Sequence, residues 1–179
     1  TTGGGNYNHG ATATFTAASN EGYTFINWTE NGTEVSNDES FEITVTENHN
    51  YVANFTQNSY TISTSSNPAN SGTTTGAGNY NNGTTATLTA SANDGYTFIN
   101  WTENGTEVSD EESFEITVTE NHNYVANFSQ NSYTISTSSN PTNGGTTTGG
   151  GNYNHGATAT FTAASNEGYT FITGQKMEQ

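Results

Sequence analysis

Histidine is the side chain best suited to acid–base chemistry near neutral pH, and the chain contains four of them. They are His9, His49, His122 and His155. A hydrolase would need such a base beside an oriented nucleophile. His9 and His155 are replaced by Asn82 at the corresponding place in the middle of the chain. His49 and His122 fall in predicted turns, so we expect no catalytic residues and no enzyme activity.

Two short acidic runs, residues 37–40 and 110–113, carry oxygen atoms that could bind Ca²⁺, which takes six or more such ligands. Their spacing matches no calcium-loop motif, and Asp38 aligns with Glu111 rather than with Asp110. We interpret both runs as solvated acidic loops. The sequence therefore predicts no metal site and no cofactor.

Aromatic side chains offer a second kind of chemistry, the stacking of sugars on exposed rings. Tyr7, Tyr80 and Tyr153 are flanked by Asn and Gly, and we expect these rings to be the ligand-facing candidates. Trp28 and Trp101 lie in apolar segments and are expected in the core. The predicted structural core consists of Trp28, Trp101, Phe25, Phe98, Phe15, Leu88, Phe55 and Phe128.

Seven Asn-x-Ser/Thr sequons could accept glycans, at Asn27, Asn31, Asn54, Asn82, Asn100, Asn104 and Asn127. Asn31 and Asn104 occupy predicted hairpin tips, where a glycan would be least obstructed. Asn82 is the third candidate glycosylation site.

The composition excludes several classes of protein. Only 28% of residues are apolar, yet 12% are aromatic, which favours several small cores over disorder. Seventeen acids against one base, Lys176, give a net charge of −16, which repels nucleic-acid phosphates. No cysteine is present, and no apolar stretch approaches the length of a membrane span, so we expect no membrane insertion.

An internal repeat of 73 residues organises the chain. The ten residues 27–36 recur unchanged at 100–109, and residues 1–26 match residues 147–172 at every position. We predict repeat 1 (residues 1–56) lacking its first strand, a complete repeat 2 (57–129), repeat 3 (130–172) lacking its C-terminal half, and a non-repeat tail (173–179). The tail could be a true terminus, a cloning remnant or the result of a frame change.

Alternation of apolar and polar residues predicts strands, for example over residues 11–17 and 41–46. Asn31–Gly32 predicts a tight hairpin, because both residues tolerate positive φ. We expect six or seven short strands in each repeat and no helix, with linkers at residues 56–59 and 129–132. Pro68 and Pro141 are expected to close the first strand of their repeats.

Residues 95–101, GYTFINW, and residues 126–128, ANF, resemble the divergent internalin B-repeat of bacterial and archaeal surface proteins. Residues 22–28 and 53–55 carry the same pattern, whereas the third copy departs from it after Phe171, before a Trp. The resemblance implies an all-β tandem array of small β-grasp-like modules used as spacers or adhesive elements. It supplies no catalytic residues.

The sequence therefore predicts an extracellular, cell-surface or secreted structural protein. We expect a stalk, fibre or filament subunit whose main partner is itself, joined head to tail by strand complementation. The alternative is a cell-surface adhesin module that binds glycans or another surface protein.

Overall fold

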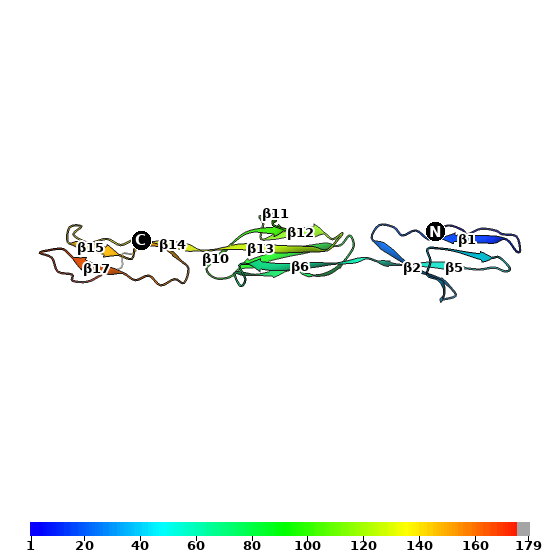
Figure 1. Ribbon diagram of the computed structural model, residues 1–179, viewed down its shortest axis with the longest axis horizontal. Helices are drawn as coiled ribbons and strands as arrows, with labels where there is room; N and C mark the ends of the chain where they lie inside the picture. Colours follow the sequence, from blue (N-terminus) through cyan, green and yellow to red (C-terminus); the bar gives the residue numbers. More distant parts are fainter. Residues whose placement is uncertain (175–179) are drawn as a thin grey trace. The chain divides into compact units, whose positions relative to one another are not determined.

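The computed structural model describes residues 1–174, which form seventeen strands and no helix (Figure 1). The all-β, tandem-repeat prediction is confirmed. Within this described part, no helix is long and apolar enough to cross a membrane.

The middle repeat has more strands than the six or seven expected. Its eight strands are β6 (Ser59–Asn67), β7 (Gly72–Thr75), β8 (Gly78–Asn81), β9 (Thr85–Ala92), β10 (Tyr96–Glu103), β11 (Thr106–Ser109), β12 (Ser113–Thr117) and β13 (His122–Gln130). The short strands β7 and β8 lie in a Gly-, Thr- and Asn-rich segment without apolar alternation. The pattern of the sequence therefore gives little sign of them.

These strands form two sheets, one of order β11-β10-β13-β6-β8 and one of order β12-β9-β7. Figure 1 shows β6 and β13 running along the middle repeat. Three hydrogen bonds between these two segments advance in the same direction, so the two strands are parallel. They join Thr61 N to Asn121 Oδ1 (2.8 Å), Ser63 Oγ to His122 O (3.4 Å) and Asn67 Nδ2 to Asn127 Oδ1 (3.0 Å).

The outer repeats contain parts of the same arrangement. Repeat 1 has β1 (Thr12–Thr16), β2 (Tyr23–Glu30), β3 (Thr33–Ser36), β4 (Ser40–Thr44) and β5 (Tyr51–Gln57), in sheets β3-β2-β5 and β1-β4. Repeat 3 has β14 (Ser132–Ile135), β15 (Gly145–Thr148), β16 (Gly151–Asn154) and β17 (Thr162–Ser165), in sheets β14-β16 and β15-β17. Repeat 1 therefore has counterparts of β9 to β13, and repeat 3 has counterparts of β6 to β9.

The predicted turns are present. Asn31 and Gly32 have φ of 50° and 81° and connect β2 to β3, and Asn104 and Gly105 repeat this turn between β10 and β11. The first strand of the middle repeat ends at Asn67, directly before Pro68, as the sequence predicts. The same prediction for Pro141 was wrong, because β14 already ends at Ile135. Local turn chemistry therefore predicted the two hairpins correctly.

A bulge brings two core aromatics to one face of β2. Phe25 pairs with Phe55 and Asn27 with Asn54, which leaves Ile26 as the extra residue. Without it, the alternation of a strand would place Phe25 and Trp28 on opposite faces. The bulge allows their rings to lie 6.2 Å apart, and Ile26 is 49% exposed.

Of the eight predicted core residues, four are buried: Trp28, Leu88, Trp101 and Phe128. The other four, Phe15, Phe25, Phe55 and Phe98, are half-buried and contact neighbouring rings. Ile62 of β6 and Val118 are also fully buried. Each core is thus built from a few rings and small aliphatic residues.

The chain divides into two compact units. One consists of Thr1–Thr64, Thr75–Thr89 and Ser113–Tyr124, and the other of Ser65–Thr74, Ala90–Glu112 and the residues from Val125 onward. The connection between repeats 1 and 2 lies within the first unit, and that between repeats 2 and 3 lies within the second.

Ile62→Ala is expected to lower the free energy of unfolding of the middle repeat by about 2–5 kcal/mol, because the removed atoms leave a cavity in a closed core. Urea denaturation, monitored through the NMR signals of the β13 amides, would measure this free energy. Ile135→Ala is the matched control, since Ile135 occupies the same ten-residue sequence but is only half-buried. Equal losses in the two variants would contradict this account of the core.

Candidate functional site: the repeat junctions and the edge of strand β5

The linkers expected between repeats are absent from the described structure. β5 ends at Gln57 and β6 begins at Ser59, while β13 ends at Gln130 and β14 begins at Ser132. One residue, Asn58 or Asn131, separates consecutive repeats. The prediction of four-residue linkers was wrong because polar strand residues at these places were interpreted as loop.

Both backbone groups of the connecting asparagine are hydrogen-bonded. Asn58 N donates to Gly22 O of repeat 1, and Asn58 O accepts from Asn82 N of repeat 2, each at 2.8 Å. At the second junction, Asn131 makes the same two bonds, to Gly95 O and from His155 N, again at 2.8 Å each. The connecting residue thus binds a turn of the repeat before it and a turn of the repeat after it.

Side chains reinforce each junction. Thr24 Oγ1 donates to Asn58 Oδ1 at 2.6 Å, and Thr97 Oγ1 donates to Asn131 Oδ1 at 2.7 Å. The glutamine before each connecting residue also reaches into the next repeat. Gln57 Nε2 donates to Asn82 O at 3.0 Å, and Gln130 Nε2 donates to His155 O at 3.3 Å.

A glycine in each junction allows close packing of the next repeat. Gly22 has φ of +77° and Gly95 has φ of +79°, and a Cβ on either would lie within 2.1 Å of Asn82 or 2.3 Å of His155. His155 Nε2 also lies 3.5 Å from Asp94 Oδ2, but that carboxylate is almost fully exposed. Such a surface ion pair adds little to stability. The close packing and the backbone hydrogen bonds therefore define the junction.

The second feature is the edge of β5, the last strand in the sheet β3-β2-β5. A cavity of about 590 Å³ opens beside it, lined by residues 1–4, Phe15, Trp28 and residues 49–51. In the middle repeat, β6 lies against the corresponding strand β13. The cavity therefore occurs in the repeat whose edge has no strand beside it in the described structure.

Identical residues are more exposed in repeat 1 than in repeat 2. Three residues of β13 are at most 4% exposed, whereas their counterparts on β5 are half-buried. The pairs are Tyr51 and Tyr124, Ala53 and Ala126, and Phe55 and Phe128. Among the described residues, Trp28 Nε1 has no hydrogen-bond acceptor, while Trp101 Nε1 donates to Glu112 O at 3.4 Å. The core of repeat 1 is thus less completely closed.

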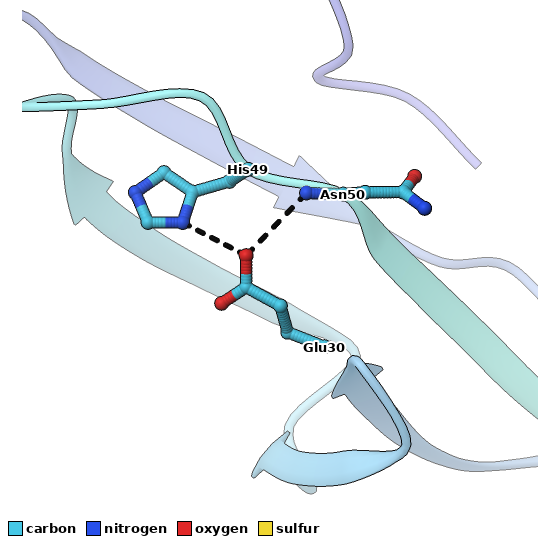
Figure 2. A network of polar contacts seen from close by, with 3 residues as sticks. All are labelled: Glu30, His49 and Asn50. Atoms are coloured by element: carbon cyan, nitrogen blue, oxygen red, sulfur yellow. Dashed lines mark hydrogen bonds and ion pairs between the residues drawn. The ribbon is translucent and has the colours of Figure 1, made fainter.

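His49 lies beside this cavity and is held by Glu30. Figure 2 shows one carboxylate oxygen of Glu30 facing both the His49 ring and the backbone nitrogen of Asn50. The Nδ1–Oε1 distance is 2.9 Å, and the Asn50 amide donates at 3.4 Å. The His49 ring stacks on Tyr51 with centroids 5.4 Å apart. This arrangement fastens the turn before β5 to the end of β2.

Burial raises the pKa of the Tyr51 phenol, and the nearby carboxylates of Glu30 and Glu47 raise it further. Both causes act in the same direction, because each disfavours the phenolate. The Tyr51 phenol therefore keeps its proton over the whole physiological pH range.

The predicted ligand-facing tyrosines occupy equivalent places. Each of Tyr7, Tyr80 and Tyr153 donates its hydroxyl to the carbonyl oxygen of the glycine four residues earlier, at 2.8, 2.8 and 2.7 Å. Tyr7 is 40% exposed, and the other two are half-buried. Their role toward a ligand stays a prediction.

The candidate glycosylation sites differ in access. Asn31 and Asn104 are exposed at hairpin tips. Asn82 is half-buried and packs against Gly22 at the junction. The structure thus places Asn82 in a contact that a glycan would disturb, while glycosylation itself stays a prediction.

The acidic runs form two equivalent turns. Asp38 N donates to Ser36 Oγ, and Glu111 N donates to Ser109 Oγ, both at 3.1 Å. Across residues 1–174, no three His, Cys, Asp or Glu side chains gather in a way that could hold a metal ion. These serines close the turns locally.

The sheets and junctions define a class of protein, a tandem array of small all-β units joined by single residues. The chain belongs to the divergent InlB B-repeat domain family, whose model matches residues 1–59, 62–132 and 135–173. The family resemblance seen in the sequence is confirmed. Proteins with this repeat are typically surface-associated. A search of curated proteins gave no match, and neither did a search of solved structures.

Sequence reasoning missed the junction residues. Asn58, Asn131, Gly22 and Gly95 look like ordinary loop residues when each is considered alone. Their signal was the 73-residue spacing itself, because residues 57–60 recur unchanged at 130–133.

Gly95→Ala is expected to loosen the second junction, because the new Cβ would lie 2.3 Å from His155 Cδ2. Gly105→Ala is the matched control, with the same φ of +79° but nothing within 4 Å of the added carbon. We expect the Asn131 and His155 amides to exchange with solvent at least about tenfold faster in G95A than in G105A. Hydrogen exchange by NMR would measure this. Equal rates would show that the contact does not hold the junction.

Glu30→Gln is expected to lower the pKa of Tyr51 toward its ordinary value, because one of the charges that raise it is removed. Since folding raises this pKa, the folded state holds the proton more tightly. Stability should therefore fall as the pH rises beyond about 10. NMR titration of ¹³C-labelled tyrosine would follow the phenol, with Glu39→Gln as control. A larger shift in the control would refute the assignment.

Proposed function

We propose that this chain is a non-enzymatic structural protein of the cell exterior, an array of small β units that forms a stalk or fibre. The observation that carries the proposal is the repeat junction. It occurs twice with the same backbone hydrogen bonds, and one residue connects the strands of consecutive repeats. A flexible tether between independent binding domains would need no such contacts.

The junction suits a spacer for a physical reason. A linker of Gly and Ser lets its ends move as a random coil, whereas a residue bonded on both sides has little freedom. Asn58 and Asn131 are each fixed by two backbone bonds and one side-chain bond. Each repeat added to such an array would therefore extend the reach of the protein.

The net charge of the chain supports a solvent-exposed array. With seventeen acids and one base, neighbouring chains repel one another at low salt. This repulsion would keep stalks apart on a crowded surface and keep them in solution. Salt would screen it over a distance of about 10 Å at 0.1 M.

The proposal includes a further step, in which chains join head to tail at the edge of a sheet. Sheet edges with free backbone groups recruit strands from other chains. A strand added to this edge by β-augmentation would link two copies without any dedicated binding domain. Filaments would then be extended stalks made of several chains.

Small-angle X-ray scattering can test the stalk. In arrays with increasing numbers of the middle repeat, the radius of gyration should grow nearly in proportion to the repeat number. Inserting Gly-Ser-Gly-Ser after each connecting asparagine should change this to growth with about the square root of the number. If both series follow the same scaling, the junctions do not stiffen the array and the stalk proposal fails.

A further inference from the structure

We propose that the paired strands β6 and β13 form a mechanical clamp, a strand pair whose bonds resist sliding and let the repeat bear tension along the chain. The inference rests on the proposed stalk, because a stalk that joins a cell to another body is pulled at both ends. Three features of the middle repeat support it: the points where tension enters and leaves the fold, the bonds between β6 and β13, and a row of side-chain amides across the sheet.

Tension on the array is applied to the middle repeat at opposite ends of one strand pair. β6 is the first strand of the repeat and begins at Ser59, and β13 is the last strand and ends at Gln130. The two strands are neighbours in one sheet and run parallel. The start of β6 therefore lies at one end of the pair, and the end of β13 lies at the other. Pulling on these two points slides one strand along the other.

The direction of loading decides how many hydrogen bonds resist the force. When one strand slides along its neighbour, the bonds along the whole pair are strained together and must break almost at once. When two strands are peeled apart from one end, the bonds break one after another, and each bond meets the force alone. A single hydrogen bond contributes little to stability, so resistance to force requires many bonds that act together. Sliding therefore gives slow unfolding under force, which is the rate that governs forced unfolding.

Hydrogen bonds that involve side chains join β6 to β13 near both ends of the pair. They connect Thr61 to Asn121, Ser63 to His122, and Asn67 to Asn127. Ile62 of β6 is only 1% exposed. Sliding of β6 would draw this side chain out of the core, which costs the free energy of exposing apolar surface to water. The pair thus resists sliding through polar and apolar contacts.

A row of side-chain amides extends the contact with β6 across the sheet. Asn67 of β6 donates to Asn127 of β13, whose Nδ2 donates to Asn100 Oδ1 of β10 at 2.9 Å. Asn100 Nδ2 in turn donates to Glu107 Oε2 of β11 at 2.5 Å. Asn is usually depleted in strands, and here each amide has a partner on the neighbouring strand. The row links four strands, so force on β6 is shared with strands beyond β13.

Single-molecule force measurements on the full chain can compare the two directions of loading. The chain contains no cysteine, so two introduced cysteines would be the only attachment points for DNA handles. In the sliding arrangement, Ser59→Cys and Ser129→Cys pull the start of β6 against the end of β13. In the peeling arrangement, Ser59→Cys and Thr119→Cys pull the start of β6 against the turn just before β13. All three residues are exposed, so the changes leave the core intact.

We expect the middle repeat to remain folded at least about tenfold longer in the sliding arrangement than in the peeling arrangement at the same constant force, because several bonds must break together. The contour length released in each event identifies it as unfolding of the middle repeat. Equal lifetimes in the two arrangements would overturn the proposal, as would a longer lifetime in the peeling arrangement.

A matched pair of variants tests the contact between β6 and β13 without moving the handles. Asn67→Ala removes the amide that bonds β6 to β13. Asn79→Ala removes the amide of β8 that accepts a hydrogen bond from Thr61 Oγ1 at 2.8 Å, on the other side of β6. Both asparagines are exposed and each change removes one such bond, so we expect similar losses of stability in urea.

Under force the two variants should differ. In the sliding arrangement we expect Asn67→Ala to shorten the folded lifetime by about threefold or more, because it removes a bond that sliding strains. Asn79→Ala should shorten it less, since β8 can move together with β6. Equal shortening in the two variants would show that the load does not pass from β6 to β13.

The outcomes separate this inference from the proposed stalk. Both pairs of handles lie within the middle repeat, so the junction residues Asn58 and Asn131 are outside the loaded segment. Equal lifetimes in the two arrangements would overturn the clamp even if scattering shows a stiff array. A longer lifetime in the sliding arrangement would support the clamp even if scattering shows flexible junctions.

Discussion

In the middle repeat, the parallel pairing of β6 with β13 covers an edge that is otherwise open, and the closure of the core depends on it. The consequence is visible in the structure because repeat 1 contains the same residues without that cover. Tyr51 and Phe55 are half-buried where Tyr124 and Phe128 are buried. Each buried ring contributes about 2–3 kcal/mol, so the covering strand decides how much of that energy a repeat gains.

This pairing also explains why the repeats are joined so tightly. The last strand of one repeat and the first strand of the next are separated by a single residue, Asn58 or Asn131. The two strands therefore cannot be placed independently, and the turns that contain Gly22 and Asn82 come into contact. Packing at the junction removes backbone groups from water, and the hydrogen bonds of the connecting asparagine satisfy these groups. Stability is then shared between neighbours, as in other repeat arrays.

Much of the fold followed from local patterns. Alternation located most of the longer strands, and Asn31–Gly32 located the hairpin, because both signals arise within a few residues. The bulge at Ile26 could not be predicted in this way, since it depends on the partner strand β5. The short strands β7 and β8 and the junction contacts depend on residues distant in sequence. The candidate site consists mainly of such contacts, so the sequence indicated its repetition but not its geometry.

Residues 1–26 and 147–172 provide the clearest evidence that partners decide local structure here. The sequences are identical, yet Thr12–Thr16 forms β1 and pairs with β4, whereas of the corresponding residues 158–162 only Thr162 lies in a strand. Conversely, residues 145–148 pair with β17, while Thr2 makes a single bridge, to Thr16. Local propensity is the same in both copies and cannot cause the difference. The conformation of each copy therefore depends on which strands of the same chain lie beside it.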